Sequence, residues 1–261
     1  MSINPQDLGI AAAPIVATRG DTMPPRAWRE LHAAACARYR AGGPFAYHFA
    51  RGKLQRDPVF RVLLASAAIA PGTRVFDIGC GQALLASLLA ACDAQVAAGR
   101  WPMLWGAAPT GTHYTGIELM PRDIARAERA LSSLPTPPRL ICGDMRSTPF
   151  VACDVAVILD VLHYVDIAAQ DDVLRRVHDV LAPRGRLLLR VGDPSQRLRF
   201  VISRCTDHVV TLARGHRAAP TWWRTLGDWR AVLQGLGFTV RAVPMSQGTP
   251  FANVLLVCDR A

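Results

Sequence analysis

The stretch Val75-Phe76-Asp77-Ile78-Gly79-Cys80-Gly81 places an apolar run, a carboxylate and two closely spaced glycines directly before a hydrophobic segment. The apolar run is typical of a short strand, and Ala83–Cys92 has the composition of a buried helix. Glycine permits the tight turn that joins such elements, and it lets a ligand approach the backbone closely. We therefore predict a strand–turn–helix unit with a ligand at the turn.

The residues of this turn favour a ligand with an amino group over a dinucleotide. A dinucleotide site is typical of the pattern G-x-G-x-x-G, but position 84 is leucine. The Asp77 carboxylate would repel a diphosphate and attract an ammonium group. Two alternatives stay open, since a lone G-x-G is a short motif: a turn that binds nothing, and an NAD(P)-dependent reductase.

Strand and helix patterns alternate along the chain, which predicts an α/β fold: a doubly wound, seven-stranded, mostly parallel sheet with an antiparallel last strand. N-terminal helices and a helical cap are expected beside it. The expected strands are Arg74–Ile78, His113–Ile117, Arg139–Cys142, Val155–Leu159, Arg186–Val191, Thr239–Val243 and Asn253–Cys258. The expected helices are Arg26–Arg40, Pro58–Ala68, Ala83–Cys92, Pro121–Leu131, Ala168–Leu181 and Leu226–Leu236.

Three more acids follow the next three expected strands: Glu118, Asp144 and Asp160. Ligands of open α/β sheets bind at the carboxyl ends of the strands, where all four acids would meet. A carboxylate at Glu118 can accept hydrogen bonds from two ribose hydroxyls. Asp144 can accept from an adenine amino group, with Met145 against the ring.

With these four acids the sequence resembles the class I, Rossmann-like S-adenosylmethionine-dependent methyltransferases. The resemblance covers residues 55–192 clearly, and it extends to the final helix and strand pair. It implies that the glycine turn holds the methionine portion of S-adenosylmethionine and that the later acids hold ribose and adenine. The cofactor-binding residues that it implies are Asp77, Gly79, Cys80, Gly81, Glu118, Leu119, Asp144, Met145 and Asp160.

The sequence departs from the family pattern in two places. Ala83 stands where a third glycine is usual, and residues 93–112, with Trp101 and Trp105, lengthen the step from Asp77 to Glu118. We expect this insertion to bulge outward without disturbing the site, and its role stays open. The segments Gly116–Pro121 and Gly248–Asn253 also resemble methyltransferases of bacterial aryl-polyene and related pigment pathways.

Methyl transfer requires a positioned acceptor, and it requires a base only when the acceptor is protonated. His163 is the candidate base, because an ordinary histidine pKa suits proton transfer near neutrality. The alternative is that His163 packs beside the cofactor and holds a loop. The candidate substrate residues are Tyr47, Arg51, Tyr164 and Asp193, of which Tyr47 and Arg51, with Lys53, are expected to reach the methionine carboxylate or an acidic acceptor.

Charge suggests how the chain is divided. The formal net charge is +10, yet residues 57–192 are neutral, while residues 1–56 and 193–261 each carry +5. We divide the chain into an N-terminal segment with cap helices, 1–56, and a methyltransferase domain, 57–261, with a substrate-cap insertion at about 195–222. The acceptor is then expected to be a small molecule, hydrophobic or acidic or both, or to be bound to an acidic carrier protein.

Other functions stay open as alternatives: a nucleic-acid (RNA) methyltransferase, and a non-catalytic cofactor-binding or interaction protein of the same fold. In the family that the sequence resembles, an Asn-Pro-Pro-Tyr sequence after the fourth strand accompanies methylation of planar amide or amino nitrogens. Its absence here disfavours DNA or protein-amide substrates.

Composition excludes some classes of protein. General disorder does not fit 51% hydrophobic and 19% charged residues. No apolar run is long enough for a membrane span, and the seven scattered cysteines form no CxxC pair. We therefore expect neither a metal site nor a disulfide framework, and a cytoplasmic protein whose oligomeric state is open.

Overall fold

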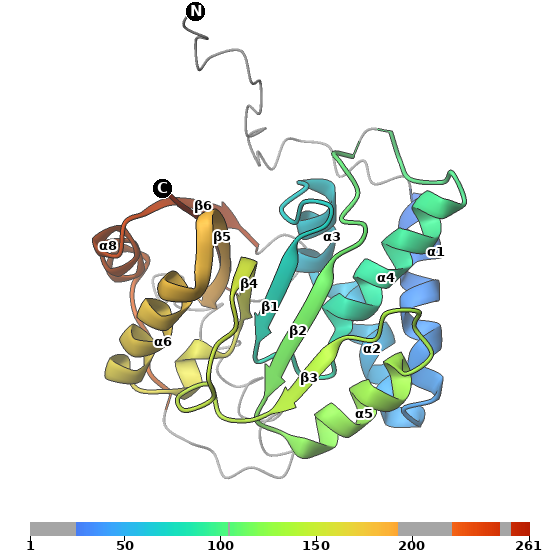
Figure 1. The fold of residues 1–261 in the computed structure, drawn as a ribbon, viewed down its shortest axis with the longest axis horizontal. Coiled ribbons are helices and arrows are strands. Elements are labelled where there is room, and N and C mark those ends of the chain that lie inside the picture. The colour runs from blue at the N-terminus through green and yellow to red at the C-terminus, as the bar shows by residue number, and fades with distance from the viewer. Residues whose placement is uncertain (1–24, 104, 193–220, 246–251) are drawn as a thin grey trace, which may run out of the picture.

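The computed structural model describes residues 25–103, 105–192, 221–245 and 252–261, and a seven-stranded sheet runs through its centre (Figure 1). The strand order is β3-β2-β1-β4-β5-β7-β6, and β7 runs antiparallel to both of its neighbours. The strands are β1 (Arg74–Ile78), β2 (His113–Glu118), β3 (Arg139–Cys142), β4 (Cys153–Leu159), β5 (Leu181–Gly192), β6 (Phe238–Pro244) and β7 (Asn253–Arg260). The expected fold class, including the antiparallel last strand, is confirmed.

Helices cover both faces of this sheet (Figure 1). One face carries α1 (Pro25–Ala37), the 3-10 turn η2 (Arg38–Arg40), α2 (Pro44–Arg56), α3 (Pro58–Ala65), α4 (Leu84–Ala97) and α5 (Pro121–Leu131). The other carries η3 (Leu162–Tyr164), α6 (Ile167–Val180) and α8 (Leu226–Gly235). Residues 193–220, which include most of the expected substrate cap, lie outside the described residues.

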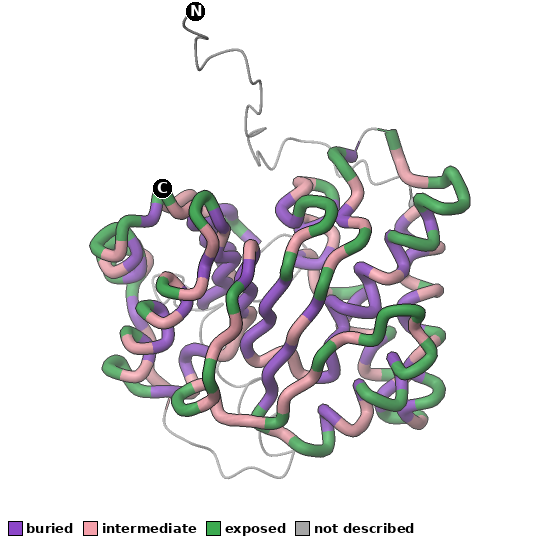
Figure 2. The backbone as a smooth tube through the Cα atoms, in the orientation of Figure 1, coloured by how far each residue is buried: buried purple, intermediate pink, exposed green. Residues whose placement is uncertain are grey.

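Successive side chains along each strand point to opposite faces of the sheet, so the sheet separates two hydrophobic cores. Val75 points into the core beneath α1–α5, whereas its neighbour Phe76 points into the core beneath α6 and α8. In β4, Val157 and Ile158 divide in the same way. The strands are therefore buried on both faces, as Figure 2 shows for the centre of the sheet.

Among the described residues, one α-helix was not predicted from the sequence. Helix α2 begins at Pro44, a residue favoured in the first turn of a helix, and it buries Ala46, Ala50 and Leu54 at intervals of four. Its small buried residues let it lie close to the core. This pattern is hard to recognise in the sequence, because Gly52 is unfavourable inside a helix and polar residues stand on both sides of the buried stripe.

The insertion between β1 and β2 lies at the amino end of these strands. Helix α4 extends through Ala97, and Trp105 packs edge-on against Trp101, with a ring centroid distance of 5.0 Å. Trp105 is itself buried in the core, and Gly106 lies against Ala67, two residues after the end of α3. The extra residues thus stabilise the amino end of the sheet, opposite the ends that carry the acids.

Among the described residues, no helix combines the length and the apolar character that crossing a bilayer requires.

A fully buried arginine connects the N-terminal helices to the sheet. Arg190 of β5 donates from Nη2 to Asp57 Oδ2 at 2.7 Å and from Nε to Asp160 Oδ1 at 2.8 Å. Asp57 also caps α3 by accepting from the Val59 N–H, and Lys53 Nζ lies 2.8 Å from Asp57 Oδ2. Arg190 and its carboxylate partners, with Lys53, therefore join α2, α3, β4 and β5 at one point.

The ionisation of this cluster reflects its burial and its partners. Burial alone would lower the pKa of Arg190, but the carboxylates of Asp160 and Asp57 raise it above the ordinary value. Burial alone would raise the pKa of Asp57, but Arg190 and Lys53 hold it below the ordinary value. Arg190 and Asp57 are consequently both charged at neutral pH.

Arg190→Met is expected to lower the free energy of unfolding by about 3–5 kcal/mol, because it leaves the carboxylates without their buried partner. The matched control is Arg74→Met, which breaks an exposed pair with Asp154 (2.7 Å) and is expected to cost at most about 1 kcal/mol. Urea denaturation measures both. Equal losses in the two variants would contradict this role for Arg190.

Candidate functional site

The glycine turn between β1 and α4 adopts a backbone that side chains disfavour. Gly79 and Gly81 have φ angles of +76° and +57°. A Cβ on Gly79 would lie 2.6 Å from Cγ1 of Val161, so this position excludes a side chain. A Cβ on Gly81 would meet no atom within 4 Å, so the backbone there faces open space. The turn is thus shaped for close approach of a ligand.

The departure at Ala83 is accommodated locally. Ala83 has a φ of +53° directly before α4, and it is fully buried. A left-handed conformation costs an alanine roughly 1–2 kcal/mol, which the surrounding packing offsets. The Gly79 and Cys80 N–H groups both donate to the Ile117 carbonyl, at 2.9 and 3.0 Å, and fix the turn against β2.

Asp77 lies buried directly before the turn, with 5% of its surface exposed. The Tyr114 hydroxyl donates to its carboxylate at 2.5 Å. Burial raises the pKa of Asp77 to about 7; the Tyr114 hydrogen bond lowers it and the nearby Glu118 charge raises it. A cation placed here would restore the charged form of the carboxylate.

Glu118 connects the end of β2 to the glycine turn. Its Oε2 accepts from the Gly81 N–H and its Oε1 from the Met120 N–H, both at 2.9 Å. A carboxylate oxygen has two lone pairs, so each oxygen can accept one more hydrogen bond. Leu119 beside it is 55% exposed and offers an apolar surface at the strand end.

Asp144 follows β3 and forms an ion pair within its own loop. The side chain of Arg146 donates to it, at 2.5 Å from Nη2, and so does the Arg146 backbone N–H at 2.9 Å. These bonds, the side-chain one first, lower the pKa of Asp144 below its ordinary value. Met145 packs against the core beneath α6, and its carbonyl accepts from Arg176. Asp144 is therefore placed as predicted but already has a partner.

Asp160 directly follows β4 and has a φ of +59°, which is rare for a non-glycine residue. Its carboxylate pairs with Arg190, and Lys53 Nζ lies 3.9 Å away. Asp160 thus connects the carboxyl end of β4 to the N-terminal helices.

His163 lies in η3 between two aromatic rings. Trp223 stacks on it with a centroid distance of 4.4 Å and an interplanar angle of 10°, and Tyr164 lies 4.1 Å away. Burial lowers the pKa of His163 to about 4, although the charge of Asp160 raises it. His163 is neutral at pH 7, with a pKa below the range that suits a base near neutrality.

The segment that brings Trp223 to this place is anchored by polar contacts. Gln170, fully buried in α6, donates to the Trp222 carbonyl at 3.0 Å and accepts from Arg224 Nε at 2.9 Å. The Trp222 N–H donates to the His163 carbonyl at 2.9 Å. A Cβ on Gly192 would lie 2.7 Å from Trp223, so the end of β5 also makes room for this ring.

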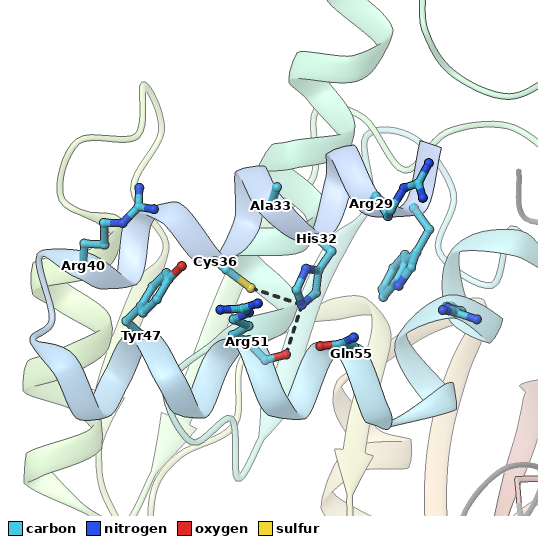
Figure 3. A pocket seen from close by; sticks show the side chains of 10 residues that line it. Arg29, His32, Ala33, Cys36, Arg40, Tyr47, Arg51 and Gln55 are labelled. Carbon is cyan, nitrogen blue, oxygen red and sulfur yellow. Dashed lines mark hydrogen bonds between the residues drawn. The ribbon is translucent and has the colours of Figure 1, made fainter. Parts of the chain in front are cut away.

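The structure brings most of the predicted site residues together at the carboxyl ends of β1–β4. Tyr47 and Arg51 lie elsewhere, in a groove between α1 and α2 (Figure 3). Asp193 lies outside the described residues. Arg190 was not predicted from the sequence, although a lone arginine within the apolar run of β5 requires a buried carboxylate partner. Nothing in the sequence indicated that Trp223 would stack on His163.

Comparisons with known proteins agree with this fold. Residues 76–187 match a family model described as a methyltransferase domain. The structure is similar to magnesium protoporphyrin IX methyltransferase (ChlM) from Synechocystis PCC 6803 with bound SAH (TM-score 0.56, 16% identity, covering 90% of this chain and 99% of that one). It is also similar to an O-methyltransferase family protein from Burkholderia thailandensis (TM-score 0.57, 16% identity, 85% and 62% covered). A third similar structure is an O-methyltransferase family 2 protein from Planctomyces limnophilus in complex with apigenin (TM-score 0.57, 16% identity, 92% and 66% covered).

A comparison of the sequence with curated proteins finds no match. The structural likenesses, at 16% identity, establish the fold, and the family model establishes the kind of domain. Residues 76–187 of this chain therefore match a methyltransferase-domain model, and the chain has the fold of the similar methyltransferase structures.

Proposed function

We propose that this protein binds S-adenosylmethionine at the carboxyl ends of β1–β4 and transfers its methyl group to a small-molecule acceptor that is hydrophobic, acidic or both. The observation that carries the proposal is the buried Asp77 carboxylate beside an open glycine turn, with Glu118 hydrogen-bonded to that turn. Buried carboxylates without a cationic partner are costly, and an ammonium-bearing ligand would supply one.

The chemistry of the strand ends fits the parts of this cofactor. Asp77 suits the ammonium group, and the remaining lone pairs of Glu118 suit two ribose hydroxyls. The exposed Leu119 and the neighbouring Met145 suit the adenine ring. Asp144, paired with Arg146, would accept the adenine amino group as an additional hydrogen-bond partner. Asp160 is proposed to border the same site.

The cofactor, when bound, supplies a methyl group that is already activated by its sulfonium. The residues of this chain then need to hold the acceptor in line and to exclude water. The stacked His163 and Trp223 rings, with Tyr164, would form an apolar wall for that purpose. His163 is unprotonated at neutral pH and is proposed as the acceptor's base, but its low pKa makes it a weak one. The proposal therefore favours an acceptor that ionises readily, such as a carboxylic acid or an acidic hydroxyl.

A hollow separate from the groove between α1 and α2 supports an acidic acceptor. It has a volume of about 320 Å³ and is lined by residues that include Phe49, Lys53, Arg56 and Asn253. Lys53 connects this hollow to the site, since its Nζ lies 3.9 Å from Asp160. Arg56 forms no ion pair within the described part of the chain. The Asp57 carboxylate also lines this hollow and pairs with Lys53 at 2.8 Å, so Arg56 is the cation left for an acid. A cation near the apolar ring of Phe49 suits a hydrophobic acid, whether it is free or bound to a carrier.

Replacement of Asp77 is expected to raise the stability of the protein and to weaken its binding of the cofactor. The pKa of Asp77 is about 7 in the folded protein and about 4 in the unfolded chain, so wild-type stability falls as the pH rises through this interval. Asp77→Asn removes that dependence. The variant is expected to melt at a higher temperature than the wild type at pH 8, with a smaller difference at pH 5.

The same variant is expected to bind S-adenosylmethionine at least about tenfold more weakly at pH 8, since a charge-assisted bond is lost. Wild-type affinity itself should decrease as the pH falls through 7 and Asp77 becomes protonated. Asp179→Asn on the exposed face of α6 is the matched control and should change neither quantity. If Asp77→Asn bound the cofactor as tightly as the wild type, the assignment of Asp77 would be wrong.

Activity is tested by incubating the protein with methyl-labelled S-adenosylmethionine and a metabolite extract, then measuring product masses. A new species heavier by one labelled methyl group, formed only with the protein, is expected. Cofactor binding without any such product from extracts rich in acidic small molecules would instead indicate a non-catalytic cofactor-binding protein. Binding of NADH in preference to S-adenosylmethionine would favour a reductase.

A further inference from the structure

A basic groove lies between α1 and α2, apart from the strand ends. Its volume is about 560 Å³, within the range of about 300–1,000 Å³ that small-molecule sites usually have. Figure 3 shows Arg40 and Tyr47 toward one end, His32 and Arg51 in the middle, and Arg29 toward the other end. The floor is tied together, because His32 Nε2 lies 3.0 Å from the Arg51 carbonyl oxygen. The groove is therefore a built recess between two packed helices.

Four guanidinium groups line this groove, and no carboxylate does: Arg29, Arg40, Arg51 and Arg61. Within the described residues, none of the four forms an ion pair. Other arginines of the described chain do find carboxylates, including Arg26, Arg74 and Arg146. Four guanidinium groups that have no ion-pair partner among the described residues thus lie together in one groove.

Two of the four guanidinium groups are held by aromatic rings. Arg40 lies 5.1 Å from the ring centroid of Tyr47, and Arg61 lies 5.2 Å from that of Trp28. A ring face attracts the flat side of a guanidinium group and leaves its N–H edges available to another partner. The rings therefore restrict the arginines without satisfying their hydrogen bonds, which lowers the entropic cost of binding an anion.

The groove lies on a different side of α2 from the proposed cofactor site. Tyr47, Arg51 and Gln55 follow one another at intervals of four residues and face α1. Lys53, which lies near Asp160, belongs to the opposite flank of the buried stripe of α2. The lining of the groove includes none of the acids at the strand ends.

We propose that this groove binds a small, elongated polyanion that carries two or more phosphate or carboxylate groups. Arg29 and Arg40 are eleven residues apart along α1 and η2, which corresponds to about 16 Å at 1.5 Å per residue. One monovalent anion cannot neutralise cations spread over that length. Guanidinium groups bind phosphate and carboxylate in the same bidentate manner, so both remain as sources of charge.

The experiment is calorimetric titration of the full chain with tripolyphosphate and, separately, with citrate, at constant ionic strength. Saturable one-to-one binding of at least one probe is expected, and the stronger one identifies the anion type. Arg51→Gln, in the middle of the groove, should weaken that binding about tenfold, since one charge-assisted contact is lost. Arg230→Gln is the matched control, because Arg230 is an exposed arginine of α8 outside the groove.

Thermal unfolding confirms that each variant is folded before titration. If neither probe binds saturably, or if Arg51→Gln and Arg230→Gln weaken binding equally, the groove is not a polyanion site. Titration with S-adenosylmethionine completes the test: Arg51→Gln should bind it as the wild type does. A loss of cofactor affinity in this variant would instead assign Arg51 to the methionine carboxylate and would overturn the proposal.

Discussion

The buried ion pair of Arg190 with Asp57 and Asp160 is the constraint on which the rest of the structure depends. A guanidinium group with 1% exposure is tolerated only where carboxylates surround it, and these come from the start of α3 and the end of β4. The pair therefore fixes the N-terminal helices against the end of the sheet and holds Asp160 in a left-handed conformation. Loss of Arg190 would release Asp57, which lines the proposed acceptor hollow, and Asp160, which is proposed to border the cofactor site.

The proposed site concentrates groups that reduce stability in the absence of a ligand. Asp77 is buried and rests on the Tyr114 hydroxyl, Gly79 and Ala83 adopt positive φ angles, and Leu119 is exposed. The burial of Asp77, the exposure of Leu119 and the left-handed backbone of Ala83 cost free energy in the folded protein. The first two become favourable beside a ligand with a cationic amine and an apolar ring. Their location at one edge of the sheet is the physical argument for binding there.

The sequence predicted the sheet and the strand-end acids well, because both depend on local patterns. The strands are marked by alternating or continuous apolar residues, and the turn is marked by its glycines. All seven expected strands occur, and the acids lie at the strand ends as expected: Glu118 is the last residue of β2, and Asp144 follows β3. It failed where the outcome depends on distant contacts. The low pKa of His163 results from burial beneath Trp223, sixty residues away, and the direction of Tyr47 and Arg51 depends on the packing of α2, a helix that the sequence analysis did not predict.

The most direct test of the central claim is an experimental structure of the full chain with S-adenosylhomocysteine. The account predicts that the ribose hydroxyls lie within hydrogen-bond distance of Glu118, that the amino group of the homocysteine part contacts Asp77, and that the adenine lies beside Leu119 and Met145. An adenosine bound in the groove between α1 and α2, or at any place that leaves Asp77 and Glu118 without contact to the ligand, would contradict it.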